Sequence, residues 1–100
     1  MPTIQPGEAK KLLDTGAVAL DVREDWEYQA GHLPEALHLP LGRLARSAEE
    51  LLPDKTRNIV VYCAGGVRSF QAAQWLCRNG WRNVWDMGSL KAWPYGIEHF

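Results

Sequence analysis

Short apolar runs alternate with amphipathic segments along the whole chain. Four runs are compact enough to be β-strands, and they lie at residues 18–22, 37–39, 59–63 and 84–87. Between them are segments with apolar residues at helical spacing, at residues 8–14, 24–30, 41–52 and about 68–79. Strands that alternate with helices over short links predict a parallel sheet with helices on both faces, because parallel neighbours need crossover connections.

One of these runs is apolar at every position. Ile59-Val60-Val61-Tyr62 shows no polar alternation, so we expect a central strand that is covered on both faces. The run leads directly into Cys63-Ala64-Gly65-Gly66-Val67-Arg68-Ser69. Ligands of open parallel sheets bind beyond the carboxyl ends of the strands, which is where Cys63 falls.

The segment from Cys63 to Ser69 has the features of an anion-binding turn. Successive backbone N–H groups and a helix N-terminus supply positive potential, which favours a reactive thiolate at Cys63. Gly65 and Gly66 allow positive φ and leave the opening unobstructed. Simpler readings stay open: Cys63 as a small buried hydrophobe, Arg68 as the partner of a nearby carboxylate rather than a ligand contact, and Ser69 as a helix N-cap.

Composition narrows the function classes. The chain has 100 residues, a net charge of −1 and no run of Lys or Arg, which predicts a single domain over residues 1–100 and argues against nucleic-acid and membrane partners. No apolar leader or transmembrane stretch is present, so a cytoplasmic location is the default expectation. The two cysteines are too few for a disulfide scaffold, and neither they nor the three histidines show metal-ligand spacing. We therefore expect no metal and no cofactor.

Two helical patterns predict which side chains are buried. In the segment 24–30, Trp26 and Ala30 are predicted to face the core. In the following helix, Cys77 shares a stripe with Phe70, Ala73 and Leu76, which predicts a packed thiol rather than a redox partner of Cys63.

Four blocks of sequence, in this order, resemble a single-domain rhodanese, a thiosulfate sulfurtransferase. They are Asp21 to Glu24 with Glu27-Tyr28, Gly31 to Pro40, Cys63 to Ser69, and Gly80 to Val84 with Ala92-Trp93. The resemblance covers nearly the whole chain and implies a three-layer α/β/α fold with a five-stranded parallel sheet in the order 3-2-4-5-1, its first strand near Thr3-Ile4. The chain departs from the family at Glu35, where Gly is usual, and at Gly88-Ser89, where a Gly-Gly pair is usual.

The resemblance also implies a chemistry. Cys63 would attack the outer sulfur of an anionic donor such as thiosulfate, release sulfite and carry the sulfur as a persulfide. Cyanide or a thiol, including a protein thiol, would then accept it. The residues that would surround the donor and the transferred sulfur are Ala64, Gly65, Gly66, Val67, Arg68 and Ser69. The inward N–H groups of Gly65, Gly66, Val67 and Arg68 would hold that anionic sulfur.

Three further residues of these blocks are expected to support the site. Asp21, Arg23 and Glu24 would hydrogen-bond loop backbone or pair with Arg68 rather than act in catalysis.

Two other function classes are alternatives to a sulfurtransferase. A cysteine phosphatase or arsenate reductase also uses a Cys-to-Arg loop at a helix N-terminus. Those phosphatase loops have one residue more than the four between Cys63 and Arg68, which corresponds to up to about 3.5 Å of chain reach. Tyr62 stands where many of them have His, and no Asp is recognisable as a general acid. A non-catalytic or sulfur-carrier rhodanese module is the other alternative.

Overall fold

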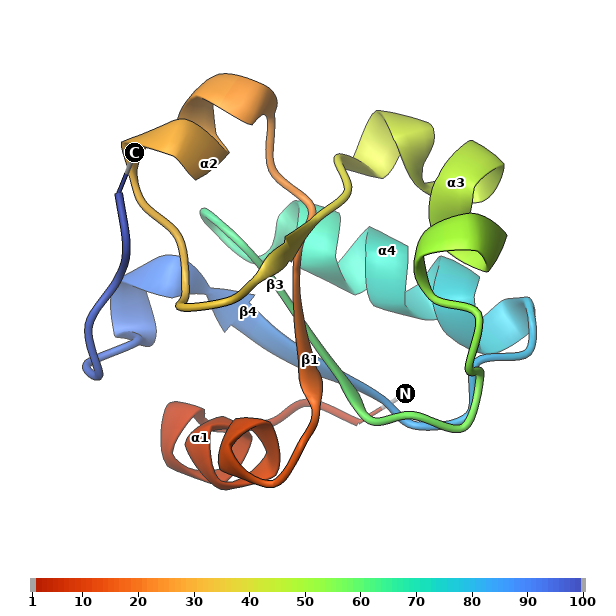
Figure 1. Cartoon of the computed structure of the whole chain (residues 1–100), viewed down its shortest axis with the longest axis horizontal. Coiled ribbons are helices and arrows are strands. Elements are labelled where there is room, and N and C mark those ends of the chain that lie inside the picture. Colours follow the sequence, from red (N-terminus) through yellow and green to blue (C-terminus); the bar gives the residue numbers. More distant parts are fainter. Residues whose placement is uncertain (1, 100) are drawn as a thin grey trace.

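Parallel strands form one sheet in the order β2-β1-β3-β4 (Figure 1). The computed structural model describes residues 2–99; Met1 and Phe100 of the predicted domain 1–100 lie outside the described residues. The strands are β1 (Val18–Asp21), β2 (Leu37–His38), β3 (Ile59–Cys63) and β4 (Val84–Ser89). The helices are α1 (Pro6–Asp14), α2 (Asp25–Ala30), α3 (Leu44–Leu51) and α4 (Val67–Arg78), with 3₁₀ turns η1 (Leu41–Arg43) and η2 (Leu90–Ala92). The four strands and four helices predicted from the apolar pattern are therefore present, and the predicted helix 41–52 divides into η1 and α3.

The predicted fifth strand is reduced to a single bridge. Thr3 pairs in parallel with Asp86 at the outer edge of β4, with Ile4 N donating to Asp86 O at 3.0 Å and Asp86 N donating to Pro2 O at 3.0 Å. The predicted strand order is correct, but the expectation of five strands is wrong, since residues 2–99 contain four. The segment is short because α1 begins at Pro6, and Pro2 has no N–H to extend a ladder.

The side chains of β3 alternate between two cores. Ile59, Val61 and Cys63 belong to the core under α3 and α4, whereas Val60 and Tyr62 belong to the core under α1. All five residues of β3 are buried, as predicted for a central strand. Figure 1 shows α1 on one side of the sheet and α3 and α4 on the other, which confirms the three-layer α/β/α arrangement.

The predicted burial of four side chains is wrong. Trp26 is 72% exposed, Phe70 is 49% exposed, and both Ala30 and Cys77 are exposed. The helix α2, which contains Trp26 and Ala30, is only six residues long, and none of its residues is buried.

In α4 the buried stripe is Ser69, Ala72, Ala73 and Leu76. Phe70 and Cys77 each follow a member of this stripe, which places them about 100° around the helix from it. The apolar pattern was misleading because a serine, not the phenylalanine, faces the sheet.

Of the two departures from the family pattern, Glu35 lies in a turn, and Gly88-Ser89 lie at the end of β4. Glu35 adopts a left-handed conformation with φ 60°, and Gly88 has φ 81°. A turn that requires positive φ explains why Gly is usual at the first position. The turn forms here with Glu at the cost of backbone strain.

Candidate active site

The thiol of Cys63 accepts hydrogen bonds from the first turn of the helix that follows it. Cys63 ends β3, and its Sγ accepts N–H groups from Gly66 at 3.0 Å and from Ser69 at 3.3 Å. Gly66 is the N-cap of α4 and has φ 105°, a conformation that suits glycine. Two amides and the N-terminus of a 12-residue helix thus direct partial positive charge at the sulfur, which stabilises a thiolate.

Cys63 as a whole residue is buried, with 1% of its surface exposed. It belongs to the core under α3 and α4, whereas Ala64 is half-buried and Gly65 is exposed. A Cβ atom placed on Gly65 would meet no other atom within 4 Å. The loop that follows Cys63 is therefore open at Gly65.

Ser69 contributes its backbone rather than its hydroxyl. Its Oγ donates to Gly66 O at 3.1 Å, and the residue is buried. The N-cap reading of Ser69 is wrong, since Gly66 holds that position. The predicted set of N–H donors contained Gly66 but not Ser69, whose amide is directed at Sγ only because α4 begins at Val67.

Arg68 is paired with a carboxylate of α2. Its Nη1 and Nη2 donate to Oε1 and Oε2 of Glu27 at 2.6 and 2.9 Å. Arg68 lowers the pKa of Glu27 from its usual 4.5 to about 2, chiefly through these hydrogen bonds, and Glu27 in turn raises the pKa of Arg68. Of the two readings left open for Arg68, the structure contains the ion pair.

Sequence reasoning missed the role of Glu27. The available signal was a capping box, because Glu27 stands three residues after Glu24 and accepts the Glu24 N–H at 2.9 Å. Glu24 itself is the N-cap of α2 and does not pair with Arg68.

Asp21 and Arg23 form a buried network after β1 that is separate from the Arg68–Glu27 pair. Arg23 Nη2 donates to Asp21 Oδ2 at 2.7 Å and to Gly31 O at 2.6 Å. The Tyr62 hydroxyl donates to Asp21 Oδ2 at 2.6 Å and accepts the Leu33 N–H at 3.1 Å. Burial, followed by the charge of Asp21, raises the pKa of Tyr62. These contacts fasten the segment after α2 to the ends of β1 and β3, and they do not reach Arg68.

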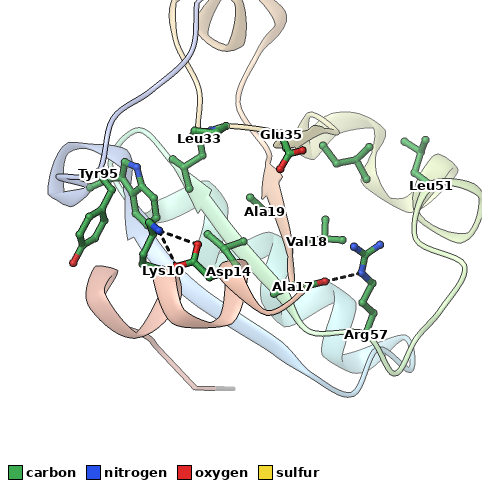
Figure 2. Close-up of a pocket in the computed structure, with 15 residues that line it drawn as sticks. Lys10, Asp14, Ala17, Val18, Ala19, Leu33, Glu35, Leu51, Arg57 and Tyr95 are labelled. Atoms are coloured by element: carbon green, nitrogen blue, oxygen red, sulfur yellow. Dashed lines mark hydrogen bonds and ion pairs between the residues drawn. The ribbon is translucent and has the colours of Figure 1, made fainter.

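Three cavities lie near the sheet, and one of them, about 440 Å³, lies between α1 and Trp85 of β4. The cavity of about 570 Å³ is shown in Figure 2 and lies beside α1 and β1. Lys10 and Asp14 form an ion pair there, and Arg57 donates to Gly16 O. The cavity of about 430 Å³ borders the Cys63–Ser69 loop at Ala64. None of these three cavities is lined by Cys63 itself, and of the three only this one is lined by a residue of that loop.

Residues 2–99 contain neither a candidate metal cluster nor a candidate membrane-spanning helix. This part of the chain has no group of three or more His, Cys, Asp or Glu side chains placed to hold a metal ion. It also has no helix with the length and apolar character needed to cross a bilayer.

Comparison with known proteins places this geometry in a family. Residues 5–94 match the rhodanese-like domain. Among curated proteins, the tRNA uridine(34) hydroxylase of Escherichia coli is 34% identical over 89 residues, which cover 84% of this chain and 25% of the relative. The chain thus spans about a quarter of the length of the curated relatives it matches.

Solved structures agree with this match. A rhodanese with anions from E. coli has a TM-score of 0.79 and 29% identity, covering 85% of this chain and 100% of its own. A human single-domain sulfurtransferase has a TM-score of 0.81 and 29% identity over 93% of this chain and 95% of its own. The rhodanese-like domain of an Anabaena protein has a TM-score of 0.85 and 30% identity, covering 100% of this chain and 80% of its own.

Proposed function

The chain belongs to the rhodanese-like sulfurtransferase family, and from that premise we propose that it moves sulfane sulfur from thiosulfate, or a similar anionic donor, to cyanide or a thiol through a persulfide on Cys63. The observation that carries the proposal is the pair of hydrogen bonds from Gly66 N and Ser69 N to Cys63 Sγ. Two N–H donors directed at one sulfur, at the end of the central strand, are the arrangement that an anionic sulfur in this reaction needs.

The proposed reaction has two displacements. In the first, the Cys63 thiolate attacks the outer sulfur of thiosulfate, a new S–S bond forms, and sulfite leaves with the electron pair of the broken bond. In the second, cyanide or a thiolate attacks the outer persulfide sulfur, and the electron pair returns to Cys63 Sγ. Neither step consumes an oxidant or a reductant, and sulfite needs no proton to depart.

The proposed reaction suits the small size of the loop. The negative charge in both steps stays on sulfur near α4, where the remaining N–H groups of Gly65, Val67 and Arg68 are proposed to receive the outer sulfur atom. Proposed partners are therefore small anionic donors and nucleophilic acceptors. A cytoplasmic location, where thiols stay reduced, is part of the same proposal.

Two observations weigh against a phosphatase or arsenate reductase. Four residues separate Cys63 from Arg68, and both terminal nitrogens of Arg68 are committed to Glu27. A tetrahedral oxyanion needs a larger cradle and a guanidinium that faces it. A non-catalytic module is disfavoured by the presence of Cys63 within an intact loop.

The curated relatives are named as tRNA hydroxylases, which points to an RNA substrate for those longer proteins. In this chain a net charge of −1 and the lack of any run of Lys or Arg argue against RNA as a partner. We therefore keep the proposal to small sulfur compounds and thiols.

Intact-mass spectrometry tests the proposed function. Incubation with thiosulfate should add the mass of one sulfur atom, and cyanide should remove it. Cys63→Ser should abolish the gain, whereas Cys77→Ser, a change at the exposed cysteine of α4, should keep it. A wild-type protein whose mass does not change with any sulfane donor would end the proposal.

A further inference from the structure

The cavity beside Ala64 is built at the carboxyl ends of three neighbouring strands. Arg23 follows β1, Ala64 follows β3, and the stretch from Leu90 to Trp93 follows β4. Neighbouring parallel strands end at the same edge of the sheet, which is where ligands of such folds bind. At about 430 Å³ the cavity lies within the usual range for small-molecule sites.

Hydrogen bonds hold this cavity against the catalytic loop. Cys63 and Ser89 are paired in the sheet, and the Ser89 hydroxyl donates to Ala64 O at 2.5 Å. The same Ser89 Oγ accepts the Lys91 N–H at 3.1 Å at the start of η2. One side chain therefore fixes both the residue after the nucleophile and the wall of the cavity.

The C-terminal segment closes the remaining side. His32 and Glu98 exchange two backbone hydrogen bonds, at 2.9 and 2.8 Å, which fasten the end of the chain across the segment after α2. Ile97 then lies directly on Gly31, where a Cβ atom would come within 2.8 Å of Ile97 Cδ1. Ile97 is thus held as a wall of the cavity rather than left to move freely.

The walls combine apolar surface with one uncommitted cation. Leu90, Trp93, Pro94 and Ile97 line the cavity, and the Trp93 indole N–H already donates to Gly96 O at 2.9 Å. Arg23 also lines the cavity, but its guanidinium forms an ion pair with Asp21. The exposed Lys91 forms no side-chain hydrogen bond or ion pair within residues 2–99. The cavity therefore offers carbon surface and one positive charge.

We infer that this cavity binds the body of the sulfur acceptor, and that the acceptor is a small thiol with an apolar or aromatic body and an anionic group. The apolar walls cover the body, and Lys91 pairs with the anionic group. The inference rests on the proposed function, and it names the acceptor class of the same site.

The transfer step balances without another reagent. Cys63 Sγ accepts the N–H groups of Gly66 and Ser69, and the cavity borders the loop at Ala64, the next residue along the chain. A thiol seated in the cavity reaches over Ala64 to the outer persulfide sulfur. Its thiolate attacks that atom, the Cys63 S–S bond breaks, Cys63 recovers its electron pair, and the acceptor leaves as a persulfide anion.

The test measures how quickly the persulfide-loaded protein returns to its original mass with different acceptors. The acceptors are 4-mercaptobenzoate, thiophenol and cyanide, and each variant is compared with wild type for one acceptor at a time, so that intrinsic nucleophilicity cancels. Lys91→Gln should raise the half-saturating concentration of 4-mercaptobenzoate by about threefold to tenfold, with thiophenol and cyanide unchanged. Ile97→Ala should raise it by about fivefold for both aromatic thiols and leave cyanide unchanged.

Lys11→Gln is the matched control, because Lys11 is an exposed lysine on α1 that does not line this cavity. It should behave as wild type with every acceptor. Equal effects of Lys91→Gln on 4-mercaptobenzoate and cyanide, or no effect on either, would overturn the inference. So would a loaded protein that transfers sulfur to cyanide but not to 4-mercaptobenzoate, and in that case the proposed function would stand.

Binding without chemistry separates the two proposals. Ligand-observed NMR with 4-methylbenzoate, which has no thiol, should show binding to the Cys63→Ser protein and weaker binding when Lys91→Gln is added. Absence of this binding overturns the acceptor site. A protein that never forms a persulfide loses the proposed function, and the acceptor role falls with it, even where the cavity binds the benzoate.

Discussion

The guanidinium of Arg68 and the carboxylate of Glu27 meet in two parallel hydrogen bonds of 2.6 and 2.9 Å. This pair joins the first turn of α4, whose amides hold the Cys63 sulfur, to α2, which buries none of its own residues. The charge of Arg68, the one cation of the Cys63–Ser69 loop, is thereby neutralised by a neighbouring helix. Attraction of an anionic donor is left mainly to backbone N–H groups and the α4 dipole.

Replacing Glu27 tests this relationship. Glu27→Gln keeps a side-chain oxygen for the Glu24 N–H but loses the charge, so the free energy of unfolding should fall by about 1–2 kcal/mol in urea denaturation. Glu8→Gln is a matched control, because Glu8 has the same capping-box position in α1 without an arginine partner. A loss no larger than that of the control would show that the ion pair does not stabilise the fold.

The stability supplied by this pair should depend on pH in a defined direction. The pKa of Glu27 is lowered from 4.5 to about 2 in the folded protein, so its contribution is complete above about pH 5 and is lost as the pH falls toward 2. The difference in unfolding free energy between wild type and Glu27→Gln should therefore shrink over that interval. Urea titrations from pH 7 to pH 2 measure it, and a difference that stays constant would contradict the assignment.

The Tyr62 hydroxyl should be structural. Tyr62→Phe leaves a buried Asp21 oxygen and the Leu33 N–H without this partner, which should cost about 1–3 kcal/mol of unfolding free energy. Persulfide formation at Cys63 should remain, because the hydroxyl lies on the α1 face of the sheet and the thiol lies on the α4 face. Tyr95→Phe, at an exposed tyrosine, serves as the control. Equal stability of the two variants would count against the network.

The length of the loop between Cys63 and Arg68 should restrict the site to sulfur transfer. A glycine inserted between Val67 and Arg68 displaces the Ser69 amide from Cys63 Sγ while leaving the Gly66 amide in place. The variant should gain little or no mass from thiosulfate, and assays with a phosphate ester show whether the longer loop admits a tetrahedral group. Insertion of glycine between Thr15 and Gly16, in an exposed turn, is the control. Full sulfur loading by the loop variant would show that the spacing is not selective.

Much of the fold could be predicted because its signals are local. The strand that ends at Cys63, the two glycines and the start of the next helix follow each other without interruption, so chain connectivity alone places the thiol at a helix N-terminus. The order of the strands followed from the family resemblance. The first strand was overestimated, since Pro2 and Pro6 limit it to one bridge.

The amino-acid sequence by itself determined that Cys63 ends a buried strand, how short the loop after it is and that a helix follows, because these features depend on neighbours along the chain. Only the tertiary structure decided that Arg68 pairs with Glu27, 41 residues away, and that Ser69 rather than Phe70 faces the sheet. It also decided that three strand ends and the C-terminal segment enclose one cavity beside Ala64. Such contacts depend on how helices rotate and pack against the sheet, and a one-residue change in the start of a helix turns every side chain by about 100°.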